Sequence, residues 1–144
     1  MSAPMLEYRI EEDGPVFSEL WLLDDVLHRH DGPACIMHRK DDGAVAFELW
    51  YEHGKLHRED GPAALYYDCD TGRVSEAHYF RKGQLFRADD GPQTMTFDAQ
   101  GRLDQALWYE GQDIAQLTWS RWLWLTRART GTGAGTGTGT GGGG

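Results

Sequence analysis

The sequence predicts a mainly β protein, an antiparallel meander of hairpin repeats of about 29 residues that ends in a short C-terminal capping helix. Large aromatic residues recur at a fixed interval, and apolar and polar residues alternate within each interval. The recurring aromatic residues are Trp21, Trp50, Tyr79 and Trp108, each 29 positions after the one before. A tryptophan-rich segment without this alternation follows, and the helix is expected there.

The repeat extends to glycine, histidine and proline positions. The same interval relates Gly43, Gly72 and Gly101, Gly54 and Gly83, and His28 and His57. One inserted residue beside Asp90 lengthens the interval to 30 before Gly91 and Pro92. So long a register indicates tandem units, which we place at about residues 15–43, 44–72, 73–101 and 102–117.

Each unit is expected to contain two strands, because its apolar residues have a period of two. In residues 45–51, the side chains of Val45 and Phe47 face one side, and those of Glu48 and Trp50 face the other. The second strand of the successive units carries Ile36, Leu65 and Met95. Turns are predicted at EHGK, RKGQ, DTGR and AQGR, where glycine supplies a positive φ.

The motif His-Arg-x-Asp-Gly-Pro occupies residues 28–33 and 57–62, and a degraded copy follows Leu85. Its aspartate, glycine and proline together suit a turn, and its arginine can pair with an aspartate of its own or a neighbouring unit. Because the motif occurs once per unit, we interpret it as repeat scaffold rather than as a catalytic site. The predicted scaffold residues are Trp21, His28, Arg29, Asp31, Gly32, Pro33, Trp50, Gly54, His57, Arg58, Asp60, Gly61, Pro62, Tyr79, Gly83, Arg87, Asp90, Gly91, Pro92 and Trp108.

After Trp108 the pattern changes. Thr118 stands where the N-cap of a helix over residues 118–128 would lie, and Trp122 and Leu123 would cover the last strands. Such a helix cannot bury all its tryptophans in one stripe, so Trp119 and Trp124 are candidate partner-binding residues. The alternative, in which Trp124 packs into the core, stays open. The repeat domain is expected to span residues 1–129, and the Gly/Thr-rich residues 130–144 to be disordered.

The charge of the chain is strongly acidic, with a formal net charge of −9. All 23 acidic residues lie at or before Asp113, whereas three arginines follow it. This distribution argues against direct nucleic-acid binding, which needs a basic surface. It permits an acidic surface, including Asp41, Asp42 and Asp89, that competes with nucleic acid for a basic protein. Acidic residues that only keep the protein soluble are the alternative.

The sequence carries no sign of a membrane segment or of export. It lacks an apolar run of membrane-spanning length, and its first residues lack the basic start and apolar stretch of a signal peptide. A cytoplasmic location is therefore expected, which would be the host cytoplasm for a phage-encoded protein. The only cysteines, Cys35 and Cys69, are far apart in sequence and are expected to be free thiols.

At WYEHGKLHREDGPA and at the closing WYEGQDIAQLTWSRWL, the chain resembles the tandem WYxxGxxHRxDGPA repeat proteins of phages, giant viruses and bacteria. The resemblance covers about residues 15–125. These proteins are in turn similar to MORN-type β-hairpin repeats, which include antitoxin components. The resemblance implies a binding role without catalytic residues. The chain departs from it at Phe86 and Gln93, which replace the His and Ala of the motif.

The motifs of known chemistry are weak. A cluster of His28, His30, Asp31, His53 and His57 could be tested for metal, but no spacing predicts that three or four of them converge. Ser75 and Ser120 lie in no nucleophile elbow, neither cysteine lies beside a histidine at a helix start, and no phosphate-binding loop is present. We therefore predict no catalytic residues, no metal site and no cofactor.

Two functions are expected from these features. The first is a non-enzymatic protein-binding repeat module, for example a phage or viral accessory protein that acts on a host protein. The second is an acidic nucleic-acid mimic that inhibits a host defence or nucleic-acid enzyme. An antitoxin-like component and a metal-dependent enzyme are weaker alternatives. Because sheet edges can pair with a second copy, a homodimer is also considered.

Overall fold

The prediction of a mainly β, antiparallel fold is confirmed by a computed structural model, which describes residues 6–89, 91–110 and 113–114. All strand pairs in this part are antiparallel, and none of its residues forms a helix. A helix that could span a membrane is therefore also absent from it. The predicted capping helix and the Gly/Thr-rich segment lie outside the described residues, as does Asp90.

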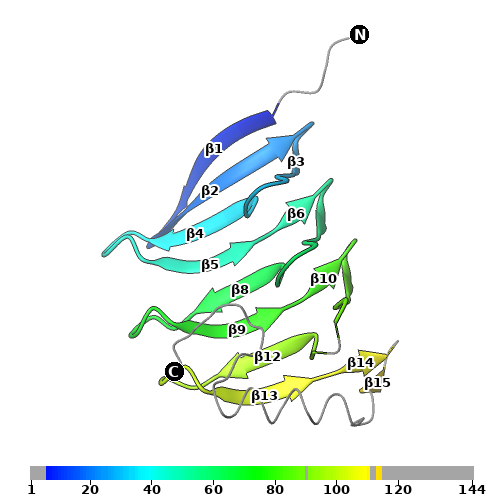
Figure 1. Cartoon of the computed structure of the whole chain (residues 1–144). Helices are drawn as coiled ribbons and strands as arrows, with labels where there is room; N and C mark the ends of the chain where they lie inside the picture. The colour runs from blue at the N-terminus through cyan, green and yellow to red at the C-terminus, as the bar shows by residue number, and fades with distance from the viewer. Residues whose placement is uncertain (1–5, 90, 111–112, 115–144) are drawn as a thin grey trace.

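Nine strands form the main sheet, which twists as its strands follow one another down the molecule (Figure 1). Eight of them are adjacent in the order β1 (Leu6–Asp13), β2 (Val16–Leu23), β4 (Cys35–Arg39), β5 (Val45–Leu49), β8 (Ala64–Tyr67), β9 (Val74–His78), β12 (Thr94–Phe97) and β13 (Leu103–Leu107). The ninth, β3 (Val26–Leu27), pairs with the end of β2. Neighbours in the sheet are thus successive long strands, as a meander requires.

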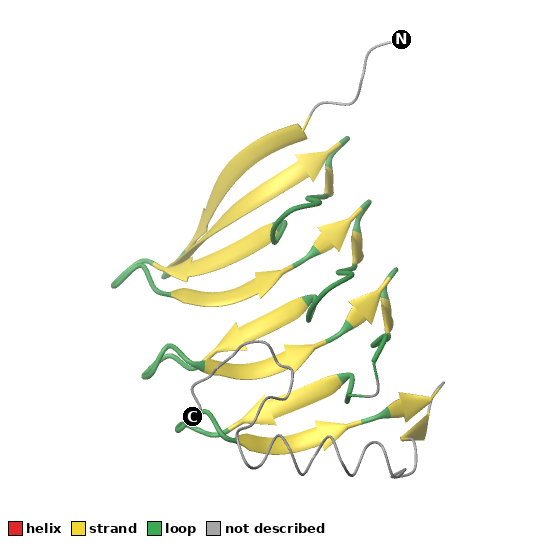
Figure 2. Ribbon diagram, in the orientation of Figure 1, coloured by secondary structure: helices red, strands yellow, loops and turns green. Residues whose placement is uncertain are grey.

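Short hairpins extend the sheet along one side (Figure 2). They pair β6 (Tyr51–Glu52) with β7 (Lys55–Leu56), β10 (Phe80–Arg81) with β11 (Gln84–Leu85), and β14 (Tyr109–Glu110) with β15 (Asp113–Ile114). The turn of the first has a positive φ at His53 and Gly54, as a two-residue hairpin turn of type I′ needs. Each unit therefore contains a second, shorter hairpin beyond the two predicted strands.

The first strand was not predicted from the sequence. β1 pairs with β2 over eight consecutive residues, from Leu6 opposite Leu23 to Asp13 opposite Val16. Gly14, with a φ of 60°, lies in the turn between them. The sheet therefore begins before the first repeat unit, at Leu6.

The two faces of the main sheet differ. Residues directly opposite each other in neighbouring strands share a face, so Ile36, Glu48, Leu65, Ala77 and Met95 lie on one side. Residues Met37, Phe47, Tyr66 and Glu76 lie on the other. We call the first the loop face, because the histidine–arginine loops cover its tryptophans, and the second the open face.

A buried cluster lies on the loop face, towards the C-terminal strands. Ala77, Met95 and Trp108 are each at most 5% exposed and form this cluster. Partly buried apolar residues pack against it, namely Leu65, Val74, Tyr79, Phe97, Leu103 and Ala106. The open face also has buried residues, because Leu22, Cys35 and Ala64 lie on it and are 7%, 8% and 3% exposed.

Candidate functional site

The arginine of each of the three loops lies over the aromatic ring that comes eight residues before it in the chain. The guanidinium carbon of Arg58 is 3.8 Å from the centre of the Trp50 ring. The equivalent distances from Arg29 to Trp21 and from Arg87 to Tyr79 are both 4.0 Å. A guanidinium over an aromatic face is attracted electrostatically and shields the ring from water. The loop is thus attached to the loop face of the sheet.

The same arginine also fixes the turn that follows it. Arg58 Nη1 donates to the Pro62 carbonyl at 3.1 Å, and Arg29 and Arg87 donate equally to their own proline carbonyls. A Cβ added at Gly61 would lie 2.8 Å from the Arg58 guanidinium carbon. Glycine here leaves room for the close approach of the arginine, which a Cβ would displace; no positive φ is involved.

The histidine joins one unit to the next. His57 Nδ1 accepts from the backbone amide of Lys82, 3.0 Å away, and His28 Nδ1 accepts from the amide of His53 at 2.8 Å. Both amides belong to residues with a positive φ in the turn of the following short hairpin. A histidine 25 residues earlier in the chain thus holds each of these turns.

The third copy of the motif uses different contacts. Phe86 has no acceptor for a backbone amide and is 42% exposed, with the Arg81 guanidinium 4.3 Å from its ring centre. Gln93, which replaces the alanine, donates through Nε2 to the Tyr109 carbonyl and accepts through Oε1 from the Tyr109 amide. In this unit, the hydrogen bonds between Gln93 and the Tyr109 backbone therefore take the place of the hydrogen bond between the histidine and the next turn.

The aspartates of the motif contribute less contact than its arginines. The side chains of Asp31 and Asp60 are 88% and 86% exposed, and each lies 3.3–3.5 Å from the Nε of its arginine. Asp89 is closer to its arginine, with Oδ1 2.6 Å from Arg87 Nε, and it also accepts from the Gly91 amide. Exposed ion pairs contribute little to stability. In the first two copies, the arginines, whose side chains are 26% and 22% exposed, are therefore the more buried members of these pairs.

A shallow cavity of about 230 Å³ lies between the second and third loops. Its lining includes three guanidinium groups and three carboxylates, in the pairs Arg58 with Asp60, Arg81 with Glu59, and Arg87 with Asp89. The charges of the lining are therefore largely balanced by one another. The lining contains no serine, threonine, cysteine or histidine that could act as a nucleophile or base.

The histidine cluster is only partly brought together. The rings of His28 and His53 are 4.4 Å apart, and Glu52 lies 3.7 Å from His30 and 3.9 Å from His57. Within the described part of the chain, no three histidine, cysteine or carboxylate side chains are placed to hold a metal ion. His28 and His57 instead bind backbone amides, as described above.

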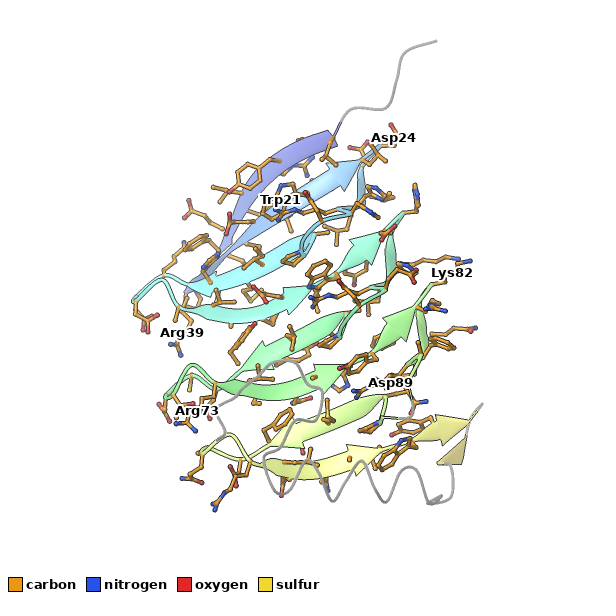
Figure 3. All side chains as sticks on the ribbon, in the orientation of Figure 1. Trp21, Asp24, Arg39, Arg73, Lys82 and Asp89 are labelled. Atoms are coloured by element: carbon orange, nitrogen blue, oxygen red, sulfur yellow. The ribbon has the colours of Figure 1, made fainter. Side chains whose placement is uncertain are left out.

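The other candidate residues lie at opposite ends of the strands. Asp41 and Asp42 are in the turn after β4, next to Arg39, whereas Asp89 lies on the side of the short hairpins (Figure 3). Asp42 pairs with Arg39 at 2.8 Å and accepts from the Ala44 amide, a bond that lowers the pKa of the Asp42 carboxyl. Trp119 and Trp124 lie outside the described residues.

The loop face also carries two sets of partly buried polar contacts towards its N-terminal strands. Glu19 lies 2.6 Å from His38 Nε2 and accepts from the Tyr8 hydroxyl at 2.8 Å. Burial raises the pKa of Glu19, but these two hydrogen bonds outweigh it, so the pKa is below its usual value. One unit later, the Tyr67 hydroxyl donates to Glu48 at 2.7 Å, and burial together with this bond raises the pKa of Tyr67.

The open face carries an apolar centre that the sequence analysis did not single out. Met37, Phe47 and Tyr66 lie opposite one another on β4, β5 and β8, and the rings of Phe47 and Tyr66 are 5.6 Å apart. All three are partly exposed. The same row continues into Ser18 and Glu11 on one side and into Glu76, Thr96 and Gln105 on the other. The alternation in residues 45–51 already contained this signal.

The described surface thus has a loop face fixed by its own contacts and an open face with partly exposed apolar side chains. The main contacts between described strands are all made between neighbours in a sheet. Comparisons of the chain with protein-family models, with curated proteins and with solved structures find no match.

Proposed function

We propose that the chain is a non-enzymatic, protein-binding repeat module whose open face is covered by a protein partner. The observation that carries this proposal is the apolar centre of the open face, which Met37, Phe47 and Tyr66 form across three neighbouring strands. Polar residues border it on both sides along the same row. An apolar, aromatic centre with a polar rim is the common arrangement of protein–protein interfaces.

The proposed architecture is about three and a half hairpin repeats closed by a helix over residues 118–128. Recurrence of the same contacts at the repeat interval supports it, since Arg29 and Arg58 bind equivalent rings and equivalent proline carbonyls. Membership of the WYxxGxxHRxDGPA group, and a role as a phage or viral accessory protein in the host cytoplasm, belong to the same proposal. Stacked repeats commonly offer a broad surface to one partner.

A role without catalysis is supported by the chemistry of the described cavity. Each of its guanidinium groups is paired with one of the lining carboxylates, so these charged groups are engaged with one another. The loop residues that a catalytic interpretation would use, His57 and Arg58, are engaged with the backbone of the chain itself. We therefore assign no cofactor to the protein.

A second candidate is the acidic mimic of nucleic acid. It is favoured by the acidic turns after β4, β8 and β12, which lie at the same end of the strands and contain Asp41, Asp42, Asp68, Asp70 and Asp98. Basic residues partly neutralise this end, because Arg39 pairs with Asp42 and Arg102 pairs with Asp98. This balance is the reason for preferring the open face as the binding surface.

The test is an affinity capture from a lysate of the source organism, and of its host for a phage-encoded chain, with the full chain carrying a C-terminal tag. Three baits are compared: the wild type, a Phe47→Ser/Tyr66→Ser variant of the apolar centre, and a Glu11→Ala/Gln105→Ala control at the rim of the same face. Circular dichroism and thermal unfolding first establish that all three are folded. Captured proteins are identified by mass spectrometry at about 0.1 M and about 0.5 M salt, which separates screened from unscreened interactions.

A protein retained at both salt concentrations by the wild type and the rim control, and lost with the Phe47→Ser/Tyr66→Ser variant, is the expected result. A nucleic-acid enzyme or defence protein that all three baits retain at low salt and release at high salt would instead indicate the acidic mimic. Equal retention at both salt concentrations by all three baits would contradict binding through the open face.

A further inference from the structure

We propose that β1 is a dimerisation edge, at which two copies of the chain pair their first strands in an antiparallel arrangement centred on Tyr8. β1 lies at the end of the main sheet and pairs with β2 alone among the described strands. Pairing with a second copy would join two nine-stranded sheets into one. This inference concerns the sheet edge rather than the open face, so it does not depend on the proposed function.

The backbone of β1 presents hydrogen-bonding groups to the free edge at its even-numbered residues. The Trp21 amide donates to Ala34, and the Trp21 carbonyl accepts from His28, so both groups point away from β1. Trp21 and its partner Tyr8 are therefore a non-hydrogen-bonded pair, and the Tyr8 amide and carbonyl point to the free edge. By the same alternation, Leu6 and Ile10 present their backbone groups there too.

The same three residues expose apolar side chains. Leu6, Tyr8 and Ile10 are 54%, 50% and 54% exposed, and their side chains lie on one face of β1. Natural edge strands are commonly protected by charged side chains, especially lysine, or by proline, a bulge or short length. β1 has eight residues, no lysine or proline, and an unbroken register with β2, and its charged residues include both signs, so they can pair between two copies. Its edge is therefore open to another strand.

Charge complementarity selects the partner and the register. With Tyr8 opposite Tyr8 of a second copy, Leu6 lies opposite Ile10, and Glu7 lies opposite Arg9, twice by symmetry. Shifting the centre to Arg9 places the two arginines opposite each other and Glu7 opposite Glu11. Centring on Ile10 places Arg9 opposite Glu11, but it also places Glu7 opposite Asp13 and Tyr8 opposite Glu12. Among the three registers, only the Tyr8-centred one has no like charges and no apolar residue opposite a charge at these positions.

Glu7 and Arg9 are available for these contacts. Their side chains are 49% and 40% exposed, and Arg9 already lies 3.1 Å from Glu7 and 3.3 Å from Glu11 of its own strand. In the dimer, the guanidinium would lie among the carboxylates of both copies. The ring of Tyr8 lies on the loop face, opposite to the side chains of Glu7 and Arg9. Its hydroxyl donates to Glu19, and its ring centre is 4.9 Å from that of Trp21.

Sedimentation equilibrium of the full chain with a C-terminal tag tests the proposal. The wild type is expected to be a dimer at about 100 µM protein, and Arg9→Glu and Glu7→Arg should each weaken dimerisation about tenfold or more, because two contacts become repulsive. The double variant Glu7→Arg/Arg9→Glu should restore it, since the charges are exchanged. Arg102→Glu, at an exposed site far along the sheet, is the control and should leave the dimer intact.

A backbone substitution makes the test independent of charge. Ile10→Pro removes an amide that faces the free edge, so it should abolish dimerisation while β1 stays paired with β2 and the circular dichroism spectrum is unchanged. A monomeric wild type at this concentration would overturn the proposal. A dimer that tolerates all of these β1 variants would overturn it equally, because the contact would then lie elsewhere.

Discussion

The two faces of the main sheet are built from alternate residues of the same strands, yet they use those residues differently. On the loop face, Trp50 is covered by Arg58, and the loop that carries Arg58 is in turn fixed by Pro62 and Gly61. On the open face, the ring of Tyr66 is 5.6 Å from that of Phe47 and 5.9 Å from that of His78, and all three side chains belong to the strands themselves. The repeated motif therefore stabilises the loop face, and the proposed function uses the other.

This comparison shows why a recurring histidine–arginine motif need not mark a site of chemistry. Each arginine contacts its own unit, and each histidine contacts the turn of the next. Together they supply both the contacts within a unit and those between units that a stacked array needs. Partly exposed residues outside this motif, on the open face and on β1, carry the two binding proposals.

The largest effect on stability is expected from substitution of Trp50, whose ring lies on the loop face under Arg58. Trp50→Ala should lower the free energy of unfolding by about 3 kcal/mol, because it leaves a cavity and removes the surface on which Arg58 lies. Phe47→Ala, on the same strand but on the open face, should cost only about 1–2 kcal/mol. Urea unfolding followed by circular dichroism measures both. Equal losses for the two variants would show that the faces do not differ in stability.

A smaller effect is expected for the arginine itself. Arg58→Ala should cost about 2 kcal/mol, the sum of a stacked cation and a hydrogen bond to the Pro62 carbonyl. The matched control is Arg102→Ala, whose side chain is 75% exposed and should change the unfolding free energy by less than about 0.5 kcal/mol. If Arg58→Ala behaves like the control, its contact with Trp50 does not contribute to stability.

The hydrogen bond from the Lys82 amide to His57, which joins two units, should contribute less to the free energy of unfolding than Arg58 does. His57→Phe copies the residue of the third unit and removes the acceptor of the Lys82 amide, so we expect a loss of about 1 kcal/mol. His57→Asn retains an acceptor near the position of Nδ1 and should recover part of this loss. Hydrogen exchange of the Lys82 amide reports on the contact directly. Exchange that stays as slow in His57→Phe as in the wild type would contradict the assignment.

The main strands and their antiparallel order could be predicted because the relevant information is periodic. Ile36, Leu65 and Met95 occupy equivalent places in successive strands, as their spacing indicates, and the turn glycines have the positive φ expected of them. β1 was missed because Leu6, Tyr8 and Ile10 alternate outside the repeat register, so a search for repeats passes over them. A pattern of period two is visible there once the strand is known.

The contacts of the candidate residues were less predictable. His57 binds the backbone amide of Lys82, and backbone groups leave no trace in the sequence at the position where they are bound. The place of Arg58 over Trp50 depends on how the loop returns across the sheet, which periodicity does not determine. The open face was missed for another reason: Phe47 and Trp50 are both aromatic, so residue type alone does not tell which face is covered.

The smallest effect on stability is expected for Asp68, which lies in the turn between β8 and β9, at the end of the strands away from the short hairpins. Asp68 accepts from the backbone amides of Thr71 and Asp70, and these bonds lower the pKa of its carboxyl below the usual value. A lowered pKa in the folded state adds stability above the pKa of the unfolded chain, near 3.9 for aspartate, and this stability is lost as the pH falls through the lower folded value. The thermal midpoint of Asp68→Ala should therefore lie below that of the wild type at pH 7, by a margin that narrows as the pH falls from 5 towards 2. Asp68→Asn keeps an acceptor but does not titrate, so its difference from Asp68→Ala should not change over this range. A margin between wild type and Asp68→Ala that is the same at both ends of the range would mean that the carboxylate charge has no part in holding the turn.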